Sequence, residues 1–562
     1  MNIGLVGSGP AAESIRAACS DIDATVTETT PDSFDEFGLG FVVAPVGNDA
    51  FDAADTASGR WIAVEIGGVG GHAIDDIDAA VSAFDRTSGD YSDLRARVAS
   101  TTESNATPSG DRAAVRLAGA IAGRRGVSLL SGDDIAGSVV EIPGRERTFL
   151  PTPEPTDRDR TVRRDFRAVE LDDALSRAEL AVDERLGIVT QVGERESFPL
   201  PYYMAQTADT TAYADTRAAE LAGGAAVGWD KAYMKALGEA LERYSAGVYR
   251  SSEFAVAPAA SRPGAVPPSR FVRPDSYRDP DPNEPIQWVD GEHLTTGTHV
   301  SLPAEFVHYP PPNERHKPSI TTGLGLGNSG TEAILSGLYE TIERDATMLA
   351  WYSTFDPLGL DVSDEEFETL AARARSEELD VTALLVTQDV DVPVVAVAVH
   401  RDDEWPKFAM GSGANLDANS AARSALAEAL QNWTELRAMG PEQASTQGGA
   451  IATYADFPDA AEAFVSPDAT IPADSVGPEE LPTGDAELDA VVERVADAGL
   501  DAYAARTTPR DVEQLGFEAV RVLIPQAQPL FIGDPFFAER AESVPRELGF
   551  EPRLDREYHP YP

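Results

Sequence analysis

Short apolar runs alternate with helical stretches through the first 150 residues of the chain. Four of the runs have the length of buried strands and end at turn residues; they are residues 2–7, 25–27, 40–43 and 61–66. This alternation is typical of an open α/β sheet. Further along, we predict a helix over 113–124, followed by two strands over 127–130 and 138–141.

The clearest break in this pattern is the proline-rich, charged stretch of residues 149–160. Such a composition is typical of a linker. We therefore predict an N-terminal α/β domain (1–150), a linker (151–164) and a second domain (165–562). The second part carries longer helices, hairpin strands and glycine-rich segments, so the predicted fold class is α/β (α+β), with mixed sheets and packed helices.

Three helical stretches of the second part resemble one another. Each joins strong helix formers to apolar residues at helical spacing, and each carries Glu followed three residues later by Glu or Gln; they are residues 236–243, 337–344 and 425–431. Residues i and i+3 share one face of a helix. Each helix therefore presents two carboxylates, or a carboxylate and an amide, in one direction, and the similarity suggests structural pseudo-symmetry.

Like charges on one helix face repel each other, so we expect these carboxylates to have a function other than contact with solvent. Two converging pairs would form a site of hard oxygen ligands, suited to Mg²⁺ that carries nucleotide phosphates. Each helix also follows a glycine-containing segment, at 223–230, 323–330 and 411–417. We predict that residues 323–330 form a loop whose N–H groups cradle phosphates at the helix N-terminus. The alternative is a set of solvated helices whose carboxylates form salt bridges.

The charge balance excludes two classes of partner. The chain has 45 Lys and Arg residues against 95 Asp and Glu residues, and its net charge of −50 is spread along the whole length. Nucleic acids and anionic membranes require basic patches, so we exclude both. Acidity of this kind favours adaptation to high salt, where ions screen the self-repulsion. The alternative is an acidic protein of a mesophile.

Cysteine and histidine usage argue against a zinc site, because Cys19 is the only cysteine and the 7 histidines show no ligand spacing. The pattern Gly7-x-Gly9-x-x-Ala12 stands where a dinucleotide loop would. Since Pro10 lacks the N–H that a phosphate needs, we interpret this segment as a structural turn. No apolar run reaches the roughly 18 residues of a spanning helix, and we predict a cytoplasmic protein.

In their order along the chain, these motifs resemble those of the YcaO family. The Glu-x-x-Glu-Arg motif ending at Arg243 and the segments 323–345 and 411–431 match three segments of the family. The resemblance covers roughly residues 165–562, which would be the YcaO domain. Residues 1–150 more weakly resemble the degenerate adenylation-type domain that is fused to cyclodehydratases of bacteriocin biosynthesis. The cysteines that hold zinc at that domain junction are absent here, so no zinc is expected.

The resemblance implies a site for ATP and Mg²⁺. The implied metal ligands are five glutamates: Glu239, Glu242, Glu332, Glu340 and Glu343. The same glutamates would also serve the nucleotide, together with Arg243, Asn328, Arg344, Glu428 and Gln431. The implied catalytic residues are Arg344 and Pro562, the second because the C-terminus of azole-forming members reaches the active site.

The implied reaction is ATP-dependent activation of peptide backbone amides, which forms azolines from Cys, Ser or Thr in a ribosomally made peptide. Alternatives are thioamide formation or an accessory role in methylthiolation of a ribosomal protein, and a non-catalytic peptide-binding scaffold. Three departures motivate the last alternative: Lys235 and Gly325 stand where Ser is common, and Ser424 where Arg is common. The expected partners are a ribosomal peptide or protein substrate, a leader-binding or sulfur-relay protein, and a second copy in a homodimer.

Overall fold

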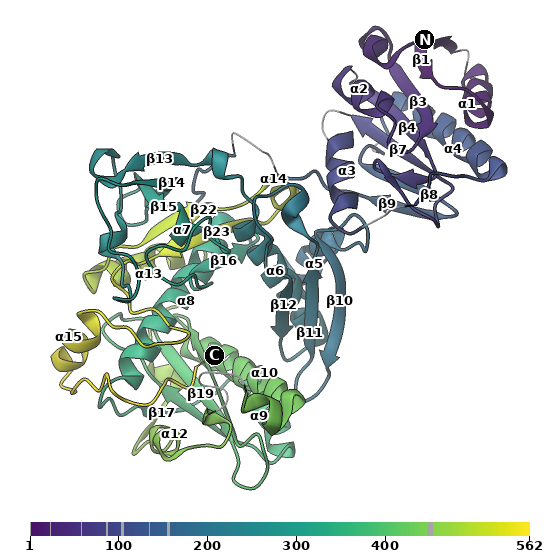
Figure 1. The fold of residues 1–562 in the computed structure, drawn as a ribbon. Coiled ribbons are helices and arrows are strands. Elements are labelled where there is room, and N and C mark those ends of the chain that lie inside the picture. Colours follow the sequence, from purple (N-terminus) through teal and green to yellow (C-terminus); the bar gives the residue numbers. More distant parts are fainter. Residues whose placement is uncertain are drawn as a thin grey trace.

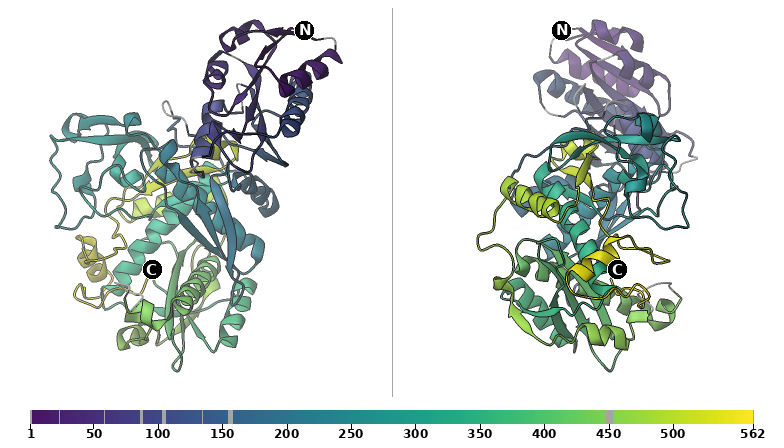
Figure 2. Two further views of the ribbon diagram at one scale, coloured as in Figure 1. Left: turned by 45° about the vertical axis from the view of Figure 1, so that its right-hand side comes forward. Right: turned by 90° about the vertical axis from the view of Figure 1, so that its left-hand side faces the viewer.

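A seven-stranded sheet forms one end of the molecule (Figures 1 and 2). The computed structural model describes residues 2–22, 24–57, 59–85, 88–102, 106–133, 135–153, 158–446 and 453–561. The elements up to residue 148 are β1 (Asn2–Val6), α1 (Pro10–Ser20), β2 (Thr25–Glu28), β3 (Leu39–Pro45), α2 (Ala50–Ala57), β4 (Arg60–Ile66), β5 (Gly68–Val69), β6 (His72–Ala73), β7 (Ala79–Asp85), α3 (Tyr91–Ala99), α4 (Arg112–Ser131), β8 (Ser138–Ile142) and β9 (Arg145–Thr148). The sheet order is β2-β1-β3-β4-β7-β8-β9. Its first four strands are parallel and the remaining pairs are antiparallel, which confirms the open α/β sheet that the apolar runs predict.

The long helix α4 corrects one prediction. Residues 127–130 lie in its last turns and not in a strand. The buried positions of α4 recur every three or four residues as far as Leu129, so the apolar run continues the helical pattern. Asp111 caps the start of the helix, and Gly132, with a φ of 87°, ends it. The strand predicted over 138–141 is confirmed as part of β8.

The rest of the chain builds three further sheets. Its elements are α5 (Leu171–Ala178), β10 (Val189–Glu196), β11 (Tyr202–Thr207), β12 (Leu221–Ala225), α6 (Trp229–Gly247), β13 (Ala255–Pro258), β14 (Pro285–His293), β15 (Thr298–Pro303), α7 (Ala304–Val307), β16 (Leu324–Gly327), α8 (Gly330–Trp351), β17 (Leu358–Asp361), α9 (Glu365–Ser376), β18 (Asp380–Leu385), β19 (Val394–His400), β20 (Phe408–Ala414), α10 (Ala418–Ala444), α12 (Asp459–Phe464), β21 (Thr470–Pro472), α13 (Asp485–Asp497), β22 (Tyr503–Arg506), α14 (Arg510–Gln514), β23 (Glu518–Leu523) and α15 (Arg540–Glu547). The sheet orders are β10-β11-β12, β13-β14-β22-β23-β16 with β15 on β14, and β20-β19-β18-β17-β21.

Helix α8 is the central element of this part. It packs against β16 and β23 of the six-stranded sheet and against β19 and β20 of the five-stranded sheet. Its side chains Ile334, Leu338 and Trp351 belong to the largest buried apolar cluster, which both sheets share. The mixed α/β fold class is confirmed, whereas the domain division at residues 150 and 165 stays a prediction. No helix within the described residues is both long and apolar enough to cross a membrane.

Candidate functional site

The three similar helices are α6, α8 and α10, and each follows a strand of its own. Helix α6 follows β12, α8 follows β16, and α10 follows β20. Each strand belongs to a different sheet, and each helix packs on the strand that precedes it. The pseudo-symmetry that the sequence suggests is therefore a strand–helix unit that occurs three times.

The glycines before the three helices allow close packing of strand on helix. Residues 324–327 form strand β16, so the loop predicted at this place is wrong, whereas the predicted phosphate contact stays a prediction. A Cβ on Gly325 would lie 2.2 Å from the carbonyl oxygen of Ala333 in α8. The same close approach occurs at Gly224, 2.1 Å from a backbone nitrogen of α6, and at Gly411, 2.4 Å from a carbonyl oxygen of α10. Glycine lets each helix backbone lie directly on its strand.

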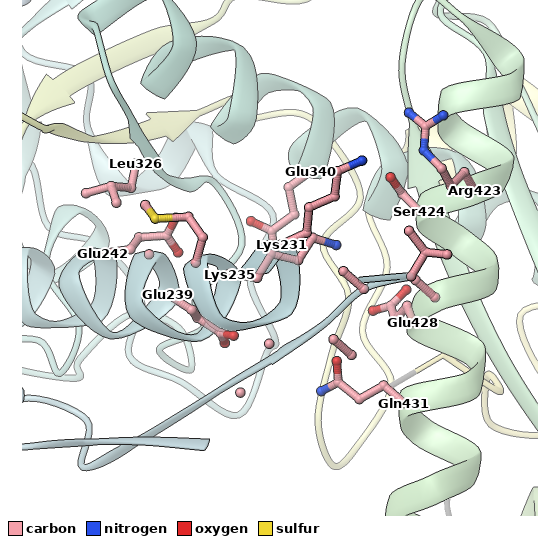
Figure 3. A pocket seen from close by; sticks show the side chains of 18 of the residues that line it. Lys231, Lys235, Glu239, Glu242, Leu326, Glu340, Arg423, Ser424, Glu428 and Gln431 are labelled. Atoms are coloured by element: carbon pink, nitrogen blue, oxygen red, sulfur yellow. The ribbon is translucent and has the colours of Figure 1, made fainter. Parts of the chain in front are cut away.

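The three helices enclose a cavity of about 760 Å³. Figure 3 shows α6 and α10 on two sides of it, with Glu340 of α8 between them. Most predicted site residues line this cavity; they are Glu239, Glu242, Asn328, Glu332, Glu340, Glu343, Arg344, Glu428 and Gln431. Arg243 is not among the lining residues. Its guanidinium pairs with Glu239 and donates a 2.9 Å hydrogen bond to the carbonyl of Leu221, so it braces a wall residue.

The carboxylates of α6 lie in surroundings that disfavour their charge. Burial, with Glu340 and Glu239 nearby, raises the pKa of Glu242 to about 8. Burial also raises the pKa of Glu239, although Arg243 opposes that effect. Arg521 of β23 is buried too, and this lowers its pKa to about 10 even though Glu340 and Glu242 favour its charged form. Burial therefore disfavours the charged form of the carboxyl groups and of the arginine in this part of the protein.

The first turn of α8 is fixed by a local network. Ser329 caps the helix by accepting the N–H of Glu332. In return, a carboxylate oxygen of Glu332 accepts the backbone N–H of Asn328 at 2.8 Å and its side-chain amide at 3.1 Å. Arg177 of α5, which the sequence analysis did not single out, donates a 2.6 Å hydrogen bond to the side-chain oxygen of Asn328. The predicted pair Asn328 and Glu332 is thus held in one orientation.

Glu343 of α8 and Glu428 of α10 meet at Ser412 of β20. The Ser412 hydroxyl donates to Glu343 at 2.6 Å, and its backbone N–H donates to Glu428 at 2.6 Å. Burial, with Glu428 close by, raises the pKa of Glu343 to about 7, although Arg344 and Ser412 oppose the shift. Ser412 was not predicted as a site residue; its only signal in the sequence is its place beside Gly411 in the third motif.

Arg344 lies between the two acids without a close bond to either. Its Nη1 is 3.7 Å from a carboxylate oxygen of Glu343, and its Nη2 is 3.6 Å from one of Glu428. The side chain is 13% exposed, and Nη1 has no hydrogen-bond partner within the described residues. A buried guanidinium N–H without a partner is costly unless a ligand satisfies it. Arg344 is therefore poised for an anion in the cavity.

Two further predicted residues stand apart from this cluster. Gln431 lines the cavity but donates to Glu435 at 3.2 Å, which in turn accepts the hydroxyl of Tyr202 at 2.7 Å. Pro562 lies outside the described residues, so its predicted catalytic role is untested. The preceding Tyr561 is 1% exposed, and its hydroxyl has no hydrogen-bond partner among the described residues.

The carboxylates line the walls without forming a ready-made metal cage. Within the described ranges, no group of three or more Asp, Glu, His or Cys side chains is placed to hold a metal ion by itself. Magnesium needs no such cage, because it is usually bound by one or two carboxylates, water and substrate phosphates. The hard oxygen donors, and the raised pKa values of Glu242 and Glu343, fit such a cation.

Comparisons with known proteins agree with this geometry. The model of the family described as YcaO cyclodehydratase, ATP- and Mg²⁺-binding, matches residues 223–528, a range that contains all three helices. An uncharacterised protein of Methanothermobacter thermautotrophicus is 30% identical over 322 residues, which are 54% of this chain and 80% of that protein.

Two solved structures share the fold. A heterocyclase in complex with substrate and cofactor has a TM-score of 0.75 and 19% identity, over 99% of this chain and 84% of that one. The YcaO protein of Methanopyrus kandleri, bound with AMPPCP and Mg²⁺, has a TM-score of 0.52 and 26% identity, over 65% of this chain and 92% of that one. With the family model matching more than half of its residues, this chain belongs to the YcaO family.

Proposed function

We propose that the cavity between α6, α8 and α10 binds ATP and Mg²⁺ and that the protein uses them to activate a peptide backbone amide. The observation that carries the proposal is that three helices with acidic side chains line one cavity. Each of these helices follows a strand of a different sheet. The description of the family supports it, as does the nucleotide analogue bound to the Methanopyrus kandleri protein.

The metal would be held by glutamates of α6 and α8, drawn from Glu239, Glu242, Glu332, Glu340 and Glu343. When bound, Mg²⁺ supplies positive charge that neutralises the phosphates and orients them. The protein contributes the oxygen donors, and neighbouring side chains hold two of them in position. Arg243 holds Glu239 in place, and Ser412 holds Glu343.

The nucleotide would be positioned by polar side chains on or next to α8 and α10 that line the cavity. Arg344 directs an N–H without a hydrogen-bond partner among the described residues toward negative charge on the transferred group. Asn328 and Glu332 offer an amide and a carboxylate at the start of α8, whereas Glu428 and Gln431 do the same from α10. Catalysis of this kind consists mostly of positioning and electrostatic stabilisation.

For the reaction itself, we propose azoline formation in a ribosomally made peptide. A Cys, Ser or Thr side chain of the substrate loses its proton and attacks the preceding carbonyl carbon, and the carbonyl oxygen takes the terminal phosphoryl group of ATP as ADP leaves. The carbon–oxygen bond then breaks to release phosphate, and the amide nitrogen loses its proton as the C=N bond of the azoline forms. Arg344 would stabilise the charge that develops on that oxygen. For Pro562, we propose a catalytic role on the basis of the family resemblance alone. A homodimer and a leader-binding partner protein remain predictions.

The experiment is phosphate release with candidate Cys-, Ser- and Thr-rich peptides, followed by the mass of the product. Glu428→Gln should reduce turnover about a hundredfold or more, whereas Glu442→Gln, at an exposed position beyond the kink of α10 at Gly440, should not. A product lighter by one water supports azoline formation, and exchange of oxygen for sulfur makes it heavier. Full turnover in Glu343→Ala would contradict the assignment, and peptide binding without any ATP binding would favour the scaffold.

A further inference from the structure

Four cations line the cavity, and they differ in how they are paired. They are Lys231, Lys235, Arg344 and Arg423. Lys231 pairs with Glu366 of α9, and Arg423 pairs with Asp364 at 2.5 Å and approaches Glu366 at 3.5 Å. These two charges are already compensated by the acidic start of α9.

Lys235 is different. It has no hydrogen bond or ion pair with any of the described residues. Its side chain is exposed to solvent in the open cavity, and the surrounding protein lowers the pKa of its ammonium group, although Glu428 and Glu239 oppose the shift. Lys231 and Arg423 disfavour its charge further. Because solvent reaches this ammonium group and no described residue pairs with it, it is free to bind an anion that enters the cavity.

The position of Lys235 on α6 complements a metal-bound polyphosphate. Lys231, Lys235, Glu239 and Glu242 follow one another at three- or four-residue spacing, so they form one stripe along the helix. The stripe is basic toward the N-terminus of α6 and acidic toward its middle (Figure 3). Such a gradient matches a ligand that carries anionic oxygens at one end and a cation beside them.

The facing wall does not supply this charge. Ser424 of α10 lines the cavity with a neutral hydroxyl, and the guanidinium of the adjacent Arg423 is engaged by α9. Within the described residues, the Lys235 ammonium has no hydrogen bond or ion pair, and the Arg344 guanidinium has no hydrogen bond and contacts carboxylate oxygens only at 3.6 and 3.7 Å. They project from α6 and α8, two helices that border the same space.

We propose that Lys235 is a phosphate-binding residue of this site, which together with Arg344 selects nucleotides by their phosphate chain. This inference rests on the proposed function and goes beyond it, because it assigns the preference for ATP and ADP over adenosine to Lys235 together with Arg344. The ligand class is a nucleoside di- or triphosphate, recognised by charge. Adenosine, which has no phosphate, gains nothing from Lys235.

The test is equilibrium binding of Mg²⁺ with ATP, ADP or adenosine to the full chain, by calorimetry at fixed ionic strength. Lys235→Met should weaken ATP and ADP binding about tenfold or more, as expected for one charge-assisted contact, and leave adenosine binding within about twofold. Lys235→Arg should retain most of the affinity. Lys407→Met, which removes one charge outside the cavity, is the matched control and should bind ATP like the wild type.

Three outcomes would overturn the inference. Wild-type affinity of Lys235→Met for ATP and ADP shows that the lysine does not contact phosphate. Equal losses for adenosine and ATP show that it only shapes the cavity. If the wild-type protein binds no nucleotide, the proposed function is wrong, and the inference that rests on it is wrong too. A wild type that binds ATP, beside a Lys235→Met variant that binds it equally well, leaves the proposed function standing and removes only this inference.

Discussion

The guanidinium of Arg97 and the carboxylate of Asp511 form a 2.5 Å ion pair across 414 residues of sequence, and neither side chain is exposed. Arg97 lies on α3, beside the N-terminal sheet, and Asp511 on α14. Tyr244, at the end of α6, donates a 2.5 Å hydrogen bond to the same carboxylate. The helix that carries Glu239 and Glu242 is therefore anchored to the N-terminal part through one buried acid.

We expect Arg97→Met to destabilise the protein by roughly 3–5 kcal/mol, because it leaves the Asp511 charge buried without its partner. The measurement is the free energy of unfolding in denaturant. The control is Arg95→Met, on the same helix α3 as Arg97, which removes an exposed ion pair with Asp52 of α2. It should lower the free energy of unfolding by less than about 1 kcal/mol. If both variants lose the same amount, the buried pair is not a structural anchor.

The strand–helix units predict a second effect. Gly325→Ala should destabilise the fold by about 1–3 kcal/mol, because its Cβ would meet the Ala333 carbonyl oxygen at 2.2 Å. It should also weaken ATP binding, since α8 must move away from β16. Gly193→Ala in β10 is the control, because nothing lies within 4 Å of the added Cβ. Thermal unfolding of the two variants, with ATP titration, checks both expectations.

The segment before the C-terminus should give the protein an acid sensitivity. His559 is 1% exposed, and its Nε2 lies 3.0 Å from the carbonyl oxygen of Phe531. Burial lowers the pKa of His559 to about 4 from an ordinary value of 6.5. Between these values the unfolded chain binds the proton and the folded one does not. Stability from the neutral ring is therefore complete above pH 6.5 and falls as the pH drops toward 4, by roughly 3 kcal/mol at most.

The check is thermal unfolding between pH 4 and pH 7.5 of the wild type and of His559→Gln. Glutamine can still donate to Phe531 but does not titrate, so the variant should lose stability less steeply on acidification. His299→Gln, at a side chain that is 67% exposed, should follow the wild type. Identical slopes for the wild type and His559→Gln would contradict this account.

The net charge of −50 predicts a strong dependence on salt. Screening of the self-repulsion should raise the free energy of unfolding as KCl increases from about 0.1 M to 1 M, over which the Debye length falls from about 10 Å to 3 Å. Denaturant titrations at several KCl concentrations, with sucrose as an uncharged control, measure this effect. A stability that is flat or falls with KCl would argue against adaptation to high salt.

The sequence determined the carboxylate helices and much of their chemistry. Helical periodicity and the Glu-x-x-Glu spacing are local properties, so they place Glu239 and Glu242 on one face whatever the rest of the chain does. The order of the motifs also sufficed to identify the family. A short apolar run is ambiguous, because it fits a strand and a buried helix segment equally well. Residues 127–130 were predicted as a strand for this reason, but they continue helix α4.

Only the tertiary structure decided what the helices meet. The sequence predicts a loop at Gly325, yet this residue lies in a strand, and the space that a side chain would need there is occupied by a helix backbone. Ser412 joins Glu343 to Glu428 across 69 and 16 residues, a contact that no local spacing contains. Whether a lysine is paired or free likewise depends on distant segments: α9 compensates Lys231 but not Lys235. Packing between segments that are far apart in the sequence sets these contacts, and for this physical reason the local sequence pattern could not predict them.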